Sequence, residues 1–371
     1  MKKYIIAIIS VIFLLCLSNY VFANDIFKPY LHNPEVPKHP TLNLEGAYQT
    51  ELWTGSSTFI YPIIVPPGRN SLQPNLFISY NNHLTGQRPS ITGSGWMLSQ
   101  NYIYRDVKNT FSDKSDDKFI LVLNGQSNEL VYVPNENRFH TKIESYLFVN
   151  NFTNGNNTNN QYWIVKDGEG TIYRFGYNNN SELVSNIHPY TTNWYLDLVN
   201  DTHENQIYFT YSKNPYQDDI GTIYPQKIEY NNEKSRIIEF IFENNNRPDM
   251  WMVYEQGNKI RESRRLKEIQ IRVDNLLVRK YIINYTLIDS SSRSLISSIT
   301  MVGSDDESTL PSTLFEYYNN SKGWEKENNF ISPIELDVGC SDPGGRIVDL
   351  NRDGLLDITF YRALKSINLK Y

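Results

Sequence analysis

Cysteine is nearly absent from this chain, which has two in 371 residues. Cys16 lies in an N-terminal apolar run that we expect to be removed, so that Cys340 alone would remain in the mature protein. A single cysteine excludes an intramolecular disulfide and a zinc site built on several thiolates. The six histidines are scattered, with no pair at metal-ligand spacing and no His-Glu-x-x-His motif.

Charged residues are also few, at 20% of the chain, and the formal net charge is -6. Affinity for nucleic acid comes mainly from Lys and Arg that contact phosphates. Loss of Lys2 and Lys3 with an N-terminal leader would make the protein still more acidic. The composition therefore argues against nucleic acid as a partner.

Long apolar runs are missing everywhere except at the N-terminus. There, Lys2 and Lys3 precede the uncharged run Tyr4 to Leu17, and Val21-Phe22-Ala23 has small residues at the two positions that signal peptidase reads. A transmembrane anchor needs about 20 apolar residues, and this run is shorter. We expect residues 1–23 to be a cleaved signal peptide, and the mature protein to be secreted into the extracellular medium without a stable membrane span.

What the chain has instead is aromatic residues, with 27 Tyr and 17 Phe, in short apolar runs separated by Gly, Pro and Asn. Such runs are typical of β-strands. The Asn124-Gly125 pair between two of them is a strong hairpin signal. The predicted strands are 58–65, 76–80, 119–123, 129–133, 172–175, 206–211, 237–242, 266–273, 278–285 and 313–317.

No stretch of twelve residues has the apolar spacing of a helix, so the sequence predicts an all-β fold with many short antiparallel strands. Residues 167–177 and 201–211 resemble each other, each with a polar turn before an aromatic strand. They are either two copies of a unit that must stack on neighbours or unrelated hairpins with similar turns. The Asn-rich tract 154–160 predicts a disordered loop tip.

Two blocks of the sequence go beyond a general β pattern. The first runs from Val65 to Tyr80 and contains Pro66-Pro67-Gly68-Arg69; the second contains Gly93-Ser94-Gly95-Trp96-Met97-Leu98-Ser99 and is followed by Ile103-Tyr104-Arg105. Together they resemble the opening of the SpvB domain, shared by the Salmonella virulence-plasmid B protein and the B components of insecticidal toxin complexes. The resemblance continues in order through 194–205, 247–257, 265–285 and 314–317, and so covers about residues 46–318. It implies a large, Rhs-shell-like β assembly.

These blocks also have a physical reading, and it is structural rather than catalytic. Pro67 and Gly68 cannot continue a strand ladder and force a turn. Gly93 and Gly95 allow positive φ and close backbone approach, which would let the Trp96 ring lie flat over a neighbouring strand. Gly-Ser-Gly-Trp is not the nucleophile elbow Gly-x-Ser-x-Gly.

A separate motif near the C-terminus predicts a calcium site. From Asp349 to Asp357, oxygen ligands fall at positions one, three, five and nine, with Gly354 at position six for a sharp turn. Calcium takes six to eight oxygens, and such spacing lets several converge. The expected ligands are Asp349, Asn351, Asp353, Asp357 and the carbonyl of Leu355. It is not an EF-hand, because position twelve is Phe360 instead of Glu; an Asp-Gly turn with scattered acids is the alternative.

The spacing of this motif resembles the calcium loop of integrin-type FG-GAP propeller blades, with strands 346–348 and 358–361 on either side. One hairpin cannot close a propeller of about four to eight blades, so we expect more blades to follow and the chain to be truncated. The predicted organisation is a signal peptide (1–23), an extended arm (24–45), an SpvB-like β domain (46–320), a linker (321–340) and an incomplete FG-GAP-like calcium hairpin (341–371).

Three classes of function remain open. The resemblance implies a secreted, non-catalytic shell or adaptor of a toxin complex or virulence protein, whose partners are a pore-forming subunit and a C-terminal effector. A second hypothesis is a host-binding module or adhesin. A third is a platform for an ADP-ribosyltransferase domain absent here; Glu325-Lys326-Glu327 has the Glu-x-Glu form of such enzymes but lacks their other motifs.

Overall fold

The computed structural model describes residues 47–50, 55–108, 110, 114–231, 233–288, 292–317, 345–348 and 357–360. The chain divides into two compact units, Met1–Tyr317 and Tyr318–Tyr371. The described residues form strands and three short 3-10 turns and contain no α-helix, which confirms the predicted all-β class. Among them no helix is long and apolar enough to cross a membrane.

The first unit begins with a four-stranded antiparallel sheet in the order β1-β2-β3-β4. Pro62 is tolerated inside β2 because the pairing with β1 stops at Ile60. The strand ends at Ile63, two residues earlier than predicted, because the chain turns into Pro66-Pro67. The elements are β1 (Ala47–Thr50), β2 (Ser57–Ile63), η1 (Arg69–Ser71), β3 (Leu76–Asn81), η2 (Asn82–Leu84) and β4 (Trp96–Leu98).

A sixteen-stranded sheet follows in the same unit. Its first part closes on itself, because β13 pairs with β5 along one edge and with β11 along the other. The short strand β12 (Glu182–Val184), which follows η3 (Asn179–Ser181), pairs with the first residues of β13. The ring of strands consists of β5 (Tyr102–Asp106), β6 (Lys118–Leu123), β7 (Gln126–Val133), β8 (Arg138–Thr141), β9 (Phe148–Phe152), β10 (Tyr162–Lys166), β11 (Ile172–Phe175) and β13 (Thr191–Asn200).

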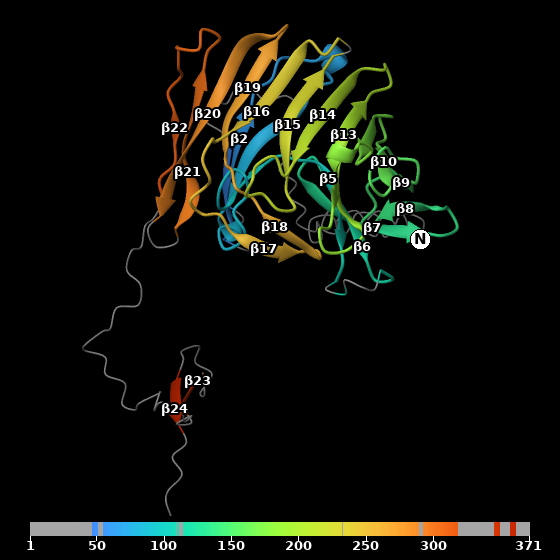
Figure 1. The fold of residues 1–371 in the computed structure, drawn as a ribbon, viewed down its shortest axis with the longest axis horizontal. Coiled ribbons are helices and arrows are strands. Elements are labelled where there is room, and N and C mark those ends of the chain that lie inside the picture. The colour runs from blue at the N-terminus through green and yellow to red at the C-terminus, as the bar shows by residue number, and fades with distance from the viewer. Residues whose placement is uncertain are drawn as a thin grey trace, which may run out of the picture. The chain divides into compact units, whose positions relative to one another are not determined.

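From β13 the same sheet continues as an open, antiparallel series of strands (Figure 1). A separate hairpin, β17 (Met252–Glu255) with β18 (Asn258–Arg261), interrupts this series in sequence. The series consists of β14 (Gln206–Lys213), β15 (Ile223–Tyr230), β16 (Arg236–Phe242), β19 (Leu266–Val273), β20 (Leu276–Ile288), β21 (Arg293–Val302) and β22 (Thr313–Leu314). The last strand is shorter than the predicted 313–317, because only two of its residues, Thr313 and Leu314, pair with β21.

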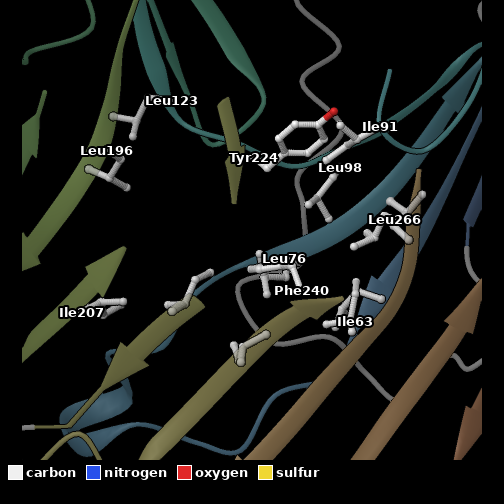
Figure 2. Close-up of a cluster of buried hydrophobic side chains, with 14 of the residues drawn as sticks. Ile63, Leu76, Ile91, Leu98, Leu123, Leu196, Ile207, Tyr224, Phe240 and Leu266 are labelled. Carbon is white, nitrogen blue, oxygen red and sulfur yellow. The ribbon is translucent and has the colours of Figure 1, made fainter. Parts of the chain in front are cut away.

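The core lies between the small sheet and the large one. Figure 2 shows Ile63 and Leu76 from the small sheet beside Phe240 and Leu266 from the large one. Inside the ring of strands the core is aromatic instead: the Trp163 ring contacts the rings of Phe119, Phe139 and Trp194. Aromatic pairs of this kind add roughly 0.5–1.5 kcal/mol each beyond the area they bury.

The two similar segments of the sequence do form the same turn. In each, the carboxylate of the first Asp, Asp167 or Asp201, accepts hydrogen bonds from the backbone N–H groups two and four residues later. The fourth residue, Gly170 or Glu204, has positive φ in both. The strands that follow, β11 and β14, both pair with β13. The segments therefore share one turn geometry, which both hypotheses allow, and whether they are copies of one unit stays a prediction.

The prediction that 154–160 is a disordered tip is wrong. The side-chain amide of Asn157 donates to the carbonyls of Gln161 and Gly176, and the backbone N–H of Thr158 donates to the buried carboxylate of Glu182. Asn side chains cap strand ends here, so an asparagine-rich composition gives an ordered loop.

The second unit contains one described hairpin, in which β23 (Gly345–Val348) pairs antiparallel with β24 (Asp357–Phe360). These strands lie close to the predicted 346–348 and 358–361. Asp357 begins β24, whereas the other four predicted calcium ligands, Asp349, Asn351, Asp353 and Leu355, lie outside the described residues. Glu325-Lys326-Glu327 also lies outside them.

Candidate functional site

Trp96 is the centre of the contact between the small sheet and the end of the large one. Its ring is 1% exposed and meets the rings of Phe59 and Phe315 edge-on, with centroids 6.3 and 4.7 Å away. Its indole N–H donates to the Tyr317 hydroxyl at 2.8 Å, and that hydroxyl donates to the Ile296 carbonyl. The Tyr80 ring, on the neighbouring strand β3, lies 5.1 Å away and is tilted by 46°, so aromatic side chains enclose the Trp96 ring.

Gly93 and Gly95 have the positive φ that the sequence predicts, at 98° and 74°. A Cβ on Gly93 would lie 2.7 Å from the carbonyl oxygen of Ser294, and one on Gly95 would lie 2.8 Å from side-chain atoms of Thr85 and Tyr80. The N–H of Ser94 donates to that same Ser294 oxygen at 2.8 Å. The glycines therefore let the chain before β4 touch β21 backbone to backbone.

The Pro66-Pro67-Gly68-Arg69 turn ties the small sheet to the distant end of β15. The Pro66 carbonyl accepts from the Tyr230 hydroxyl at 2.7 Å, and the Arg69 N–H donates to the side chain of Asn231 at 3.0 Å. A Cβ on Gly68 would overlap the Leu72 carbonyl oxygen, 1.7 Å away. Pro67 and the Arg69 side chain are exposed. This turn is held through its backbone, as the structural reading predicts.

Arg105 lies at one end of the ring interior, 8% exposed. Its Nη1 is 2.6 Å from a carboxylate oxygen of Asp117, and its Nε donates to the Thr191 carbonyl at 3.1 Å. The guanidinium carbon lies 5.1 Å from the Phe119 ring centroid and 5.8 Å from that of Trp194. A buried cation with an ion partner and aromatic neighbours is a packing element.

Sequence reasoning assigned no role to a buried polar network in the segment before β17. The guanidinium of Arg247 bonds both carboxylate oxygens of Asp249 and the Ser90 carbonyl, and Asp249 accepts the N–H of Ser294 at 2.8 Å. Burial acts to raise the pKa of Asp249, but the bonds and charge of Arg247 outweigh it, and the pKa is lowered. The Arg-Pro-Asp spacing was visible in the sequence; the distant partners were not.

A second buried carboxylate, Asp197, behaves in the opposite way. It accepts from Arg174 Nε at 2.7 Å, from the Ser181 hydroxyl at 2.9 Å and from the Asn178 N–H at 3.0 Å. Burial raises its pKa, and these contacts offset the effect only in part. Because each of its partners is a structural neighbour, the shift reflects packing.

Within the described part of the chain, no group of three His, Cys, Asp or Glu side chains could hold a metal ion. The residues singled out from the sequence gather at three separate places: Gly93, Gly95 and Trp96 where β4 meets β21, the Pro67–Arg69 turn at β15, and Arg105 in the ring. They do not converge on a common cleft. The arrangement joins sheets, and it sets no nucleophile beside a base.

Comparison with known proteins agrees with this architecture. A family model described as SpvB, the Salmonella virulence plasmid 65kDa B protein, matches residues 52–254. No curated protein matches the chain.

Solved structures share its fold. The crystal structure of TcdB2-TccC3 has a TM-score of 0.60 at 17% identity and covers 72% of this chain and 16% of that one. The Photorhabdus luminescens Tc holotoxin pore has a TM-score of 0.63 at 16% identity, with 86% and 18% covered. The N-terminal domain of effector protein SpvB from Salmonella typhimurium strain LT2 has a TM-score of 0.50 at 15% identity, with 65% and 98% covered.

The chain thus spans less than a fifth of the TcdB2-TccC3 and holotoxin chains. The structural matches establish a common fold, and the family model covers more than half of the sequence. The protein belongs to the SpvB family.

Proposed function

We propose that the chain is an exported, non-catalytic scaffold: part of the shell or adaptor of a bacterial toxin assembly that holds or delivers a separate effector. The observation that carries the proposal is that the motif residues have structural roles: Gly93, Trp96 and Arg105 all join strands or fill the core. The fold is shared with TcdB2-TccC3 and with a Tc holotoxin pore. The apolar N-terminal run supports export by a cleaved signal peptide.

An exposed apolar face supports contact with another subunit of such an assembly. Phe148 and Phe152 lie on β9 on the side opposite to the buried Val149, and Tyr146, which is 85% exposed, precedes that strand. Val131 on β7 and Ile143 in the connection to β9 are also exposed. Grouped apolar side chains on a protein surface mark interaction sites. We call Val131, Ile143, Tyr146, Phe148 and Phe152 the outer face.

The test is co-purification of the full chain from the producing bacterium, with partners identified by mass spectrometry. We expect toxin subunits to accompany the chain and to be lost from a Tyr146→Ser, Phe148→Ser double variant. Leu276→Ser is the matched control, because Leu276 is 73% exposed at the start of β20, away from the outer face. A chain recovered alone would contradict the scaffold proposal, and partners retained by the double variant would contradict the role of the outer face.

The non-catalytic part of the proposal has its own test. The full chain is incubated with labelled nicotinamide adenine dinucleotide and actin, and we expect no label on actin. Transfer of label would show an ADP-ribosyltransferase and would contradict the scaffold role as stated.

The calcium loop Asp349–Asp357 and the propeller it would begin belong to the same proposal. In support, β23 and β24 pair with Val348 opposite Asp357, so that the loop residues are the connection of a hairpin. Exported modules of this kind bind calcium at roughly 0.1–1 mM. The ion would stabilise the hairpin and take no part in a reaction.

A further inference from the structure

We propose that protonation of His140 fixes the outer face and thereby strengthens its contact with a partner subunit, a regulation that rests on the docking role proposed above. His140 alternates along β8 with the buried Phe139 and Thr141, so its side chain points outward. It lies directly opposite Val131, an outer-face residue on β7. The side chain is 22% exposed and can therefore exchange its proton with solvent.

A carboxylate lies beside each nitrogen of the His140 ring. Nε2 is 3.0 Å from an oxygen of Glu136, in the turn before β8, and Nδ1 is 3.5 Å from an oxygen of Glu144, which follows β8. A neutral imidazole carries one N–H group, whereas an imidazolium carries two. A neutral ring can therefore donate to only one of the two carboxylates and turns a lone pair towards the other. Only the protonated ring satisfies both.

The carboxylate of Glu144 also holds the chain that carries the outer face. It accepts the backbone N–H of Tyr146 at 2.6 Å, and the Ser145 N–H donates to the Thr141 hydroxyl at 3.1 Å. Tyr146 has a φ of 56°, in the left-handed region that a bulky residue adopts only where its surroundings hold it there. Its side chain is the most exposed of the outer face, at 85%. A proton on His140 therefore acts on Tyr146 through Glu144.

The other charged groups around His140 already have partners. Glu136 accepts a second bond from Arg138, whose Nε lies 2.6 Å from it. Lys142, which follows β8, lies 3.1 Å from a carboxylate oxygen of Glu129 on β7. Neither of these pairs needs the proton on His140.

Glu144 is different, because His140 is its only ion-pair partner among the described residues. The pKa of Glu144 is lowered, mainly by the bond from the Tyr146 N–H and to a smaller extent by His140. This carboxylate therefore keeps its charge above pH 5. Histidine is the side chain that changes charge between pH 5 and 8. The ion pair between His140 and Glu144 thus forms at the acid end of this range and is lost at the alkaline end.

The first experiment uses the full chain alone and follows the Tyr146 amide by NMR between pH 5 and 8. We expect its chemical shift to titrate with the same midpoint as the His140 ring. Its exchange with water, corrected for the intrinsic effect of pH, should be about 1.4- to 5-fold slower at pH 5, the effect of one exposed ion pair. His140→Gln should abolish both changes. His83→Gln is the matched control, because His83 is an exposed histidine that follows β3. A Tyr146 amide that does not titrate in the wild type, or that titrates equally in His140→Gln, would overturn the proposal.

The second experiment measures how fast co-purified partner subunits leave the immobilised full chain at pH 5.5 and at pH 8. We expect slower release at pH 5.5 from the wild type and from His83→Gln, and equal rates at the two pH values from His140→Gln. Equal or faster release from the wild type at pH 5.5 would overturn the control by pH and leave the scaffold role intact. Absence of any partner at both pH values would contradict the scaffold role itself, and the control by pH would fall with it.

Discussion

The contact between Gly93 and β21 can be tested with three glycine-to-alanine variants that separate two physical effects. Gly86 has neither a positive φ nor an atom close to its missing Cβ. Gly55 has φ +67° and open space around that position. Gly93 has φ +98° and the Ser294 carbonyl oxygen 2.7 Å from where a Cβ would lie. Alanine at Gly55 therefore introduces backbone strain alone, whereas alanine at Gly93 introduces both backbone strain and a steric clash.

The expected costs follow in that order. Gly86→Ala should be neutral or stabilise by up to about 1 kcal/mol, because alanine restricts the unfolded chain. Gly55→Ala should destabilise by about 1–2 kcal/mol, the usual penalty for an L-residue in the left-handed region. Gly93→Ala should cost about 1.5–4.5 kcal/mol, since about 1–3 kcal/mol of strain is joined by loss of the Ser94 N–H to Ser294 bond, worth about 0.5–1.5 kcal/mol.

The assay is urea unfolding of the full chain followed by tryptophan fluorescence, to which the buried Trp96 beside this contact contributes. The three variants should share one slope of free energy against urea, because they expose the same surface on unfolding. A Gly93→Ala variant that costs no more than Gly55→Ala would refute the reasoning, since the backbone approach would then have room for a methyl group.

Two further predictions concern charges. The pKa of Asp249 is lowered in the folded protein, so its contribution to stability is present above the unfolded value of about 3.9 and is lost as the pH falls through the folded value. Asp249→Asn should therefore cost about 3–5 kcal/mol at pH 7, because Arg247 loses its closer carboxylate and keeps only Glu262 at 3.8 Å. The variant's melting temperature should also fall less steeply as the pH is lowered; a fall parallel to that of the wild type would contradict this. Calcium at about 1 mM should stabilise the second unit by about 0.4–1.4 kcal/mol; Asp353→Ala should abolish the rise in melting temperature, and equal shifts in both proteins would refute the site.

The features predictable from the sequence are those fixed by neighbouring residues. Asn124 and Gly125 both have positive φ and join β6 to β7, as an Asn-Gly hairpin requires. The predicted strands 172–175 and 266–273 coincide with β11 and β19. In each case the signal lies within about ten residues, where turn chemistry and alternating burial act directly.

Closure of the ring could not be predicted, because it depends on which strands meet. β13 pairs with β5, about 90 residues earlier in the chain, and its register against β11 shifts at Phe175. Neither the pairing nor the register shift can be inferred from the order of apolar and polar residues in β13. Short strands such as β9, with the sequence Phe-Val-Asn-Asn-Phe, were not predicted, because their polar residues are typical of a loop. They form strands only because neighbouring strands pair with them.

The same distinction explains which motif residues could be interpreted. The positive φ of Gly93 and Gly95 was predictable, since it belongs to the residues themselves. The partner of Trp96 was not: Tyr317, which accepts the indole N–H, is more than 200 residues away. Arg247 and Asp249 likewise depend on Ser90 and Ser294, which come from opposite ends of the unit.

These long-range bonds explain how one sheet of sixteen strands holds together. Ser90, Ser94 and Trp96, in and just before β4, bond to distant residues. Their partners are Arg247 before β17, Ser294 on β21 and Tyr317 after β22. Each such bond crosses between segments that strand pairing alone would leave free to separate. The polar groups involved are already hydrogen-bonded within the protein and are not available to a substrate.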